Sequence, residues 1–113
     1  MINYYLNALG GWDANKMNIL ETSEEYIIYL RATGLKKEDI KLSITGDTLT
    51  VKSEKEEDST KYLRHEFWDD ILNLNLSLPA GVDTENPEAS LENGILRITL
   101  KKGDSGKKMI EIS

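Results

Sequence analysis

The stretch Ala89-Ser90-Leu91-Glu92-Asn93-Gly94-Ile95-Leu96, continuing into Arg97-Ile98-Thr99-Leu100, predicts a β-hairpin. Asn93-Gly94 accepts the positive φ angles that a tight two-residue turn requires. Before the turn, Ala89 and Leu91 share one face of a short strand. After the turn, apolar and polar residues alternate, which places Leu96, Ile98 and Leu100 inward and Arg97, Thr99 and Lys101 outward.

The same kind of alternation recurs along the chain and predicts an all-β fold. Residues 26–32 are rich in β-branched and aromatic side chains, and residues 40–45 and 48–52 alternate on either side of Gly46-Asp47. Residues 62–67 fit a further short strand. The most regular alternation is that of Leu72, Leu74, Leu76 and Leu78, which Pro79 ends. Many short strands with frequent turns favour an antiparallel β-sandwich.

Composition limits the classes of function. With 113 residues the chain is expected to form one domain with tails. A net charge of −6 argues against binding to nucleic acid or to an anionic membrane. The absence of cysteine rules out disulfides and thiolate metal sites and suits a reducing cytoplasm. The first twelve residues lack the basic region of a signal peptide, and no apolar run is long enough to span a bilayer.

The two ends differ in pattern from the expected sandwich of residues 19–102. Residues 1–18 form a short arm in which Ile2, Tyr5, Leu6 and Leu9 follow helical spacing before Gly10-Gly11. Residues 103–113 form a flexible extension that carries Ile110-Glu111-Ile112. Two isoleucines at i and i+2 point the same way on an extended strand, so they need a surface to cover them. That surface belongs either to another subunit or to the sandwich of the same chain.

Several blocks resemble, in the right order, the α-crystallin domain of small heat-shock proteins. The hairpin is similar to the signature A-x-x-x-N-G-x-L, and Ile110-Glu111-Ile112 is similar to the C-terminal I-x-I. Thr33-Gly34-Leu35-Lys36-Lys37-Glu38-Asp39-Ile40 resembles P-G-x-x-K-E-D-I, with threonine in place of the proline. Gly46 to Val51 resembles G-x-x-L-x-I. Further resemblances are Y-x-R-x-E at Tyr62 to Glu66 and F-x-L-P at Leu76 to Pro79, with leucine for phenylalanine.

The resemblance implies an immunoglobulin-like sandwich that dimerises by exchanging a loop strand. That strand corresponds here to Tyr62, Leu63, Arg64, His65 and Glu66. A groove walled by Leu42, Ile44, Ala89 and Leu91 would receive Ile110 and Ile112 as an added edge strand. The family usually has an arginine five residues before the L-P proline, on the strand that meets the neighbouring subunit. This chain has Leu74 there, which changes an ionic contact into an apolar one.

The function implied is that of an ATP-independent chaperone, a holdase that works as a homodimer-based oligomer, binds unfolding client proteins and needs no cofactor. An aromatic-rich set on the arm offers adaptable contact area to clients or subunits, or packs on the domain itself: Ile2, Tyr4, Tyr5, Leu6, Leu9 and Trp12. The alternatives are a co-chaperone of the CS-domain type or other protein-binding module, and a structural coat component. One histidine and no cysteine do not supply the groups of an enzyme active site.

Two polar features have simple interpretations. His65 is expected at the surface or in an interface, because a lone histidine between Arg64 and Glu66 has no partner for catalysis or metal binding. Asp69-Asp70 is expected to form a solvated turn, because adjacent strand residues point to opposite faces and do not make a carboxylate pair.

Overall fold

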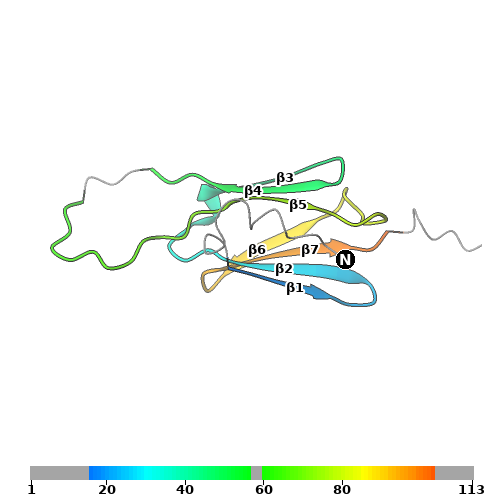
Figure 1. The fold of residues 1–113 in the computed structure, drawn as a ribbon, viewed down its shortest axis with the longest axis horizontal. Coiled ribbons are helices and arrows are strands. Elements are labelled where there is room, and N and C mark those ends of the chain that lie inside the picture. Colours follow the sequence, from blue (N-terminus) through cyan, green and yellow to red (C-terminus); the bar gives the residue numbers. More distant parts are fainter. Residues whose placement is uncertain (1–15, 57–59, 104–113) are drawn as a thin grey trace, which may run out of the picture.

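The computed structural model describes residues 16–56 and 60–103, which form a sandwich of two antiparallel sheets (Figure 1). The larger sheet has the strand order β1-β2-β7-β6, and the smaller has the order β3-β4-β5. The strands are β1 (Met17–Glu21), β2 (Glu25–Arg31), β3 (Ile40–Thr45), β4 (Thr48–Ser53), β5 (Asn73–Ser77), β6 (Glu88–Glu92) and β7 (Ile95–Lys101). A 3-10 turn, η1 (Lys37–Asp39), precedes β3. The all-β sandwich is therefore confirmed.

The decisive hairpin forms as expected. β6 and β7 pair antiparallel with Leu91 opposite Leu96 and Ala89 opposite Ile98. Asn93 and Gly94 form the turn with φ of 53° and 75°, the left-handed conformation that a two-residue hairpin turn needs. The second expected hairpin joins β3 and β4 through Gly46, whose φ is 60°. In both hairpins the turn residues determine the register, and the register places the apolar side chains on one face.

The core lies between the sheets, and every residue of the leucine alternation belongs to it. Leu72, Leu74, Leu76 and Leu78 are all buried, as are Leu96, Ile98 and Leu100 on the facing sheet. Thr99 is also buried, although the alternation predicts it outward. It does point to the outer face, but β7 is a central strand, and Ile27 and Glu88 flank Thr99 on the neighbouring strands.

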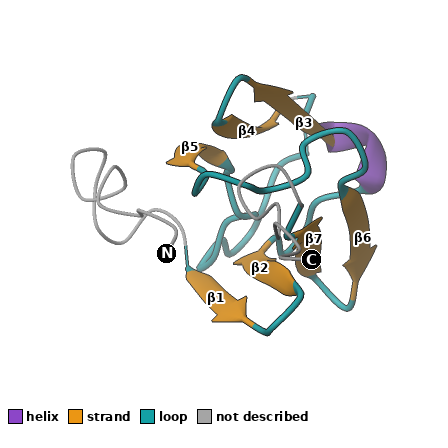
Figure 2. Cartoon of the chain, turned by 90° about the vertical axis from the view of Figure 1, so that its right-hand side faces the viewer, coloured by secondary structure: helices purple, strands orange, loops and turns teal. Residues whose placement is uncertain are grey.

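The end-on view shows which strands are the free edges (Figure 2). β3 and β6 lie at one side of the sandwich, and β5 and β1 lie at the other. β1 begins at Met17, so the first strand includes the last two residues assigned to the arm. Edge strands offer unpaired main-chain groups to an added strand, so this arrangement determines where another segment of chain can pair.

Candidate interaction sites

A groove opens along the side of the sandwich where β3 and β6 are the edges. It encloses about 330 Å³. Leu49 and Ile98 form its floor, and Leu42, Ile44 and Ala89 contribute its walls. The side chain of Leu42 is 37% exposed, which is high for a residue on the inner face of a strand. Three of the four predicted groove residues therefore come together, whereas Leu91 packs against the core near the hairpin turn and does not line the groove.

The rim of this groove is a short loop that the sequence reasoning did not single out. Thr84, Glu85, Pro87 and Glu88 line it. Asp83 orders the loop, because its Oδ1 accepts a hydrogen bond from the N–H of Glu85 at 2.9 Å and its Oδ2 accepts one from Nδ2 of Asn86 at 3.3 Å. The bond from Glu85, followed by that from Asn86, lowers the pKa of Asp83 below its usual value. The groove thus has an apolar floor and an acidic rim.

A second candidate site is the projecting segment, residues 60–71, which extends beyond the end of both sheets (Figure 1). Its large apolar side chains are at least 60% exposed, namely Tyr62, Leu63, Phe67, Trp68 and Ile71. The short strand predicted for residues 62–67 does not form in this chain. The physical reason is that the segment lies away from both sheets and so has no neighbouring strand with which to form a ladder. Exchange of Tyr62 to Glu66 with a second copy stays a prediction.

Aromatic rings give the projecting segment some local order. The rings of Tyr62 and His65 stack with centroids 4.2 Å apart, and His65 lies 4.5 Å from Trp68 at a tilt of 34°. The surface position expected for His65 agrees with this arrangement, since its side chain is exposed. The stack keeps three aromatic side chains together on one short stretch of chain. It leaves most of their surface open to a partner.

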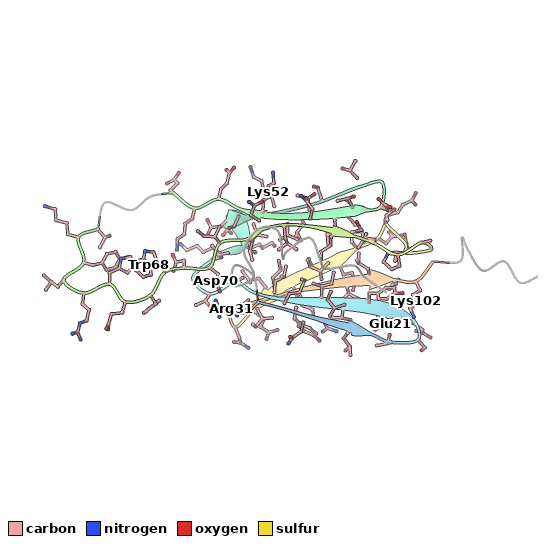
Figure 3. All side chains as sticks on the ribbon, viewed as in Figure 1. Glu21, Arg31, Lys52, Trp68, Asp70 and Lys102 are labelled. Carbon is pink, nitrogen blue, oxygen red and sulfur yellow. The ribbon has the colours of Figure 1, made fainter. Side chains whose placement is uncertain are left out.

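At the base of the projecting segment, Asp70 binds back to the sandwich (Figure 3). Both carboxylate oxygens accept from Nε of Arg31 at 3.1 Å, and Oδ1 also accepts from Nη2 at 3.0 Å. Oδ2 accepts from the N–H of Thr33 at 2.7 Å, and the N–H of Asp70 donates to the carbonyl of Thr33 at 2.9 Å. Partial burial raises the pKa of Asp70, but the hydrogen bonds from Arg31 and Thr33 outweigh burial and the net pKa lies below its usual value.

Asp69 binds on the other side of the same connection. Nζ of Lys55 donates to Oδ2 of Asp69 at 2.5 Å and to the carbonyl of Gly34 at 2.8 Å. The hydrogen bond to Asp69 raises the pKa of Lys55. The expected turn at Asp69-Asp70 does not form, and Asp70 is largely buried, so the expectation is wrong for Asp70. Asp69 is exposed, and the two carboxylates bind different partners, as expected of adjacent residues. The six residues Arg31, Thr33, Gly34, Lys55, Asp69 and Asp70 are called the loop-base clamp below.

Leu74, the position where the family's arginine is expected, is a core residue. Its side chain is 3% exposed and its Cα is opposite that of Val51 within the smaller sheet. Leu74 thus contributes to the sandwich of its own chain. The arm residues Ile2, Tyr4, Tyr5, Leu6, Leu9 and Trp12, and the tail residues Ile110 and Ile112, lie outside the described residues.

No helix among residues 16–56 and 60–103 is long and apolar enough to cross a membrane. Within the same ranges, no three histidine, cysteine, aspartate or glutamate side chains gather in a way that would hold a metal ion.

Comparison with known proteins assigns the family. The model of the Hsp20/alpha crystallin family matches residues 18–113, so this chain belongs to that family. It is 33% identical over 102 residues to small heat shock protein C2 of Rickettsia felis, which covers 86% of this chain and 66% of that protein. It is 31% identical over 97 residues to the 17.8 kDa class I heat shock protein of Arabidopsis thaliana, covering 81% and 62%. The chain therefore spans two thirds or less of the length of these relatives.

Solved structures support the fold. A small heat-shock protein from Xylella fastidiosa superposes with a TM-score of 0.71 at 21% identity, covering 88% of this chain and 95% of that one. Heat shock protein 16.0 from Schizosaccharomyces pombe superposes with a TM-score of 0.67 at 23% identity, covering 88% and 75%. The immunoglobulin-like sandwich of the α-crystallin domain is therefore the fold of this chain.

Proposed function

We propose that this protein is an ATP-independent chaperone, a holdase that binds unfolding proteins and prevents their aggregation, and that it works as a dimer-based homo-oligomer. One observation carries the proposal. The sandwich has an open apolar groove between the edges β3 and β6, in a chain that also carries the matching motif Ile110-Glu111-Ile112. Membership of the Hsp20/alpha crystallin family supports it.

The groove suits an extended segment with two isoleucines at i and i+2. Such a segment would add a strand at a free edge and place both side chains over the floor of Leu49 and Ile98. Burying two isoleucines gains about 3 to 6 kcal/mol. Ordering the tail and joining the subunits costs a similar amount. One tail in one groove is therefore a weak contact that exchanges readily, and several contacts per oligomer hold the assembly together.

The groove proposal rests on the three-part organisation of the chain, with an arm over 1–18, the sandwich over 19–102 and an extension over 103–113.

The extension also carries Lys107 and Lys108, which precede the motif and complement the acidic rim formed by Glu85 and Glu88. In an extended strand Lys108 points to the same side as Ile110 and Ile112. Charge complementarity of this kind favours one register of the tail over others.

The projecting segment suits the dimer contact. Its exposed apolar side chains and the main chain of residues 62–66 would add to a partner's free edge strand β1, and the partner's segment would do the same in return. Exchange of this kind gives a symmetric dimer without a new fold. It would bury the segment's exposed rings, which a single chain leaves in water.

Clients would contact surfaces that become exposed when subunits separate, including the arm from Ile2 to Trp12 and the groove itself. Weak, numerous contacts suit a store of subunits that opens under stress. We place this activity in the cytoplasm, without cofactor, enzymatic step, nucleic acid or membrane. The net charge of −6 and the absence of cysteine support that placement.

The test pairs two measurements on the full chain. Light scattering of a heat-unfolded model client is followed with and without the protein and with no nucleotide present, and the protein's mass is measured over the same temperatures by size-exclusion chromatography with light scattering. We expect suppression of client aggregation together with a mass above that of a monomer at the lower temperatures.

A stable monomer that leaves client aggregation unchanged would overturn the proposal. If that monomer binds one particular folded partner, the co-chaperone or binding-module function replaces it. Formation of filaments or insoluble layers without client protection would instead indicate a structural coat component. Bovine serum albumin at equal mass serves as the control for non-specific protection.

A further inference from the structure

The two ends of the projecting segment are fastened to the same short connection of the sandwich. Lys55 lies on the outgoing side of the segment, and Asp69 and Asp70 lie where the chain returns. Two of them bind the residues that follow β2, since Lys55 donates to the carbonyl of Gly34 and Asp70 exchanges backbone and side-chain hydrogen bonds with Thr33, and the Asp69 carboxyl group lies against Gly34. Lys55 and Asp69 also form an ion pair with each other. The base of the segment is thus closed by contacts from both sides.

The Asp70 half of the clamp is built for a fixed geometry. The planar guanidinium of Arg31 meets the carboxylate with hydrogen bonds to both oxygens, which sets orientation as well as distance. The side chain of Asp70 is only 12% exposed, so water competes weakly for these bonds. An exposed ion pair alone contributes little, but this carboxylate also accepts from the Thr33 N–H.

The Asp69 half depends on Gly34. Gly34 has φ of +83°, a conformation that residues with a side chain rarely adopt. A Cβ at this position would lie 2.0 Å from Oδ1 and 2.4 Å from Cγ of Asp69. The Asp69 carboxyl group therefore occupies the space that a side chain at position 34 would fill. The position is glycine for two independent reasons, the backbone angle and the close approach.

The connection that receives both carboxylates is itself held to the sandwich. Ala32 and Leu35 are buried in the core, and the N–H of Ala32 donates to the carbonyl of Gly94 at 2.7 Å. Gly94 is in the turn of the β6–β7 hairpin, and a Cβ there would lie 3.8 Å from Cα of Thr33. The clamp thus anchors the segment to the part of the sandwich that the hairpin turn supports.

We propose that the loop-base clamp sets the direction in which the projecting segment leaves the sandwich, so that Asp70 acts as a positioning residue for the capture of a second copy of this chain. The proposal rests on the proposed dimer contact and deepens it. A segment held at its base would present its exposed side chains Leu63, Phe67 and Trp68 in a narrower range of directions than a free one. Less conformational entropy is then lost when a partner's β1 edge binds them. Releasing the base widens that range and weakens the dimer, although the sandwich stays folded.

The experiment measures the dimer dissociation constant of the full chain by sedimentation equilibrium, in a background of Ile110→Ala with Ile112→Ala that removes tail contacts. We expect Asp70→Asn to raise the dissociation constant about tenfold, because it removes the charge from the hydrogen bonds to Arg31. Lys55→Gln tests the other half of the clamp and is expected to act in the same direction. The matched control is Glu54→Gln, which removes one charge nearby from a side chain that is mostly exposed and lies 3.8 Å from Lys41.

A second readout separates positioning from loss of structure. Trp68 is followed by fluorescence anisotropy in a Trp12→Phe background, at a concentration where the protein is monomeric. We expect lower anisotropy in Asp70→Asn than in its parent, with the far-ultraviolet circular dichroism spectrum unchanged and with both proteins fully folded at the temperature of the measurement. Equal dissociation constants and equal anisotropy for Asp70→Asn and its parent would overturn the positioning role.

The outcomes also distinguish this inference from the proposed function. If the parent itself does not dimerise, or dimerises equally well when Leu63 is replaced by aspartate, the proposed exchange fails. If the parent dimerises through the segment and Asp70→Asn, Lys55→Gln and Glu54→Gln all match it, the exchange stands and the clamp proposal fails.

Discussion

The groove and the projecting segment are both apolar and both open to solvent, but they differ in what holds them. The groove is lined by strands of two sheets, and its floor belongs to the buried core. The projecting segment has no strand of its own and is held at its base by the loop-base clamp. A preformed groove binds without rearranging, whereas an extended segment must be ordered by its partner. The groove is thus suited to repeated weak contacts, and the projecting segment is suited to a contact in which it becomes ordered on its partner.

Removing the tail motif is the strongest test of the groove side of this comparison. We expect Ile110→Ala with Ile112→Ala to convert the oligomer mainly into dimers, because the groove loses the two side chains that fill it. Size-exclusion chromatography with light scattering measures the mass. Met109→Ala with Glu111→Ala is the control, since these residues point to the opposite side of an extended strand. An unchanged oligomer in the first variant would remove the tail from the assembly.

The next largest effect is expected from a substitution in the projecting segment, which weakens the proposed dimer contact and leaves the groove unchanged. We expect Leu63→Asp to raise the dimer dissociation constant about 30-fold, which corresponds to about 2 kcal/mol, because it places a charge in an apolar contact. Leu63 is fully exposed in the single chain, so the sandwich itself should keep its thermal stability. Lys61→Gln changes the net charge equally and serves as control. Sedimentation equilibrium measures both, and a loss of folded protein in Leu63→Asp would contradict the exposed position.

A region can be predicted from the sequence when its interactions join residues that are close together in the chain. The hairpin from Ala89 to Leu100 and the leucines of β5 are local alternations, so their strands and buried faces could be predicted directly. The groove residues Leu42, Ile44 and Ala89 could be named through the family resemblance. They meet because two hairpins from different sheets place their edges side by side.

The loop-base clamp could not be predicted in this way. Asp70 and its partner Arg31 are separated by 39 positions, and nothing in the pattern around either one indicates the other. In the sequence, two adjacent aspartates suggest a polar turn. Only the folded chain shows that Asp70 binds Thr33 and that the Asp69 carboxyl group lies against Gly34. Leu74 raises the same difficulty, because its position in the motif suggested an interface although its alternation placed it in the core.

An effect on the stability of the single chain, not on its assembly, sharpens the comparison at Gly34, where the segment meets the sandwich. We expect Gly34→Ala to lower the free energy of unfolding by about 2 to 4 kcal/mol, because both the positive φ and the Asp69 carboxyl group oppose a Cβ. Gly46→Ala is a matched control, since Gly46 also has a positive φ, of +60°, but has no atom within 4 Å of its Cβ position. Chemical denaturation measures both, and equal losses would show that the Asp69 contact contributes nothing.

The smallest expected effect is acid sensitivity of the segment side, which follows from the lowered pKa of Asp70. A carboxylate whose pKa is lower in the folded chain stabilises the fold above its unfolded value, about 3.9. That contribution is lost as the pH falls below this value and through the folded pKa. Many other carboxylates protonate in the same range, so the informative quantity is the ratio of dimer dissociation constants between Asp70→Asn and its parent. We expect this ratio to stay constant from pH 6 to about 4 and to shrink only as the pH falls further, through the folded pKa of Asp70, because protonation of Asp70 in the parent removes the same charge that the substitution removes. A ratio that begins to shrink well above pH 4, measured by sedimentation on protein that is still folded, would show that a group other than Asp70 controls the segment, because the pKa of Asp70 lies below its usual value.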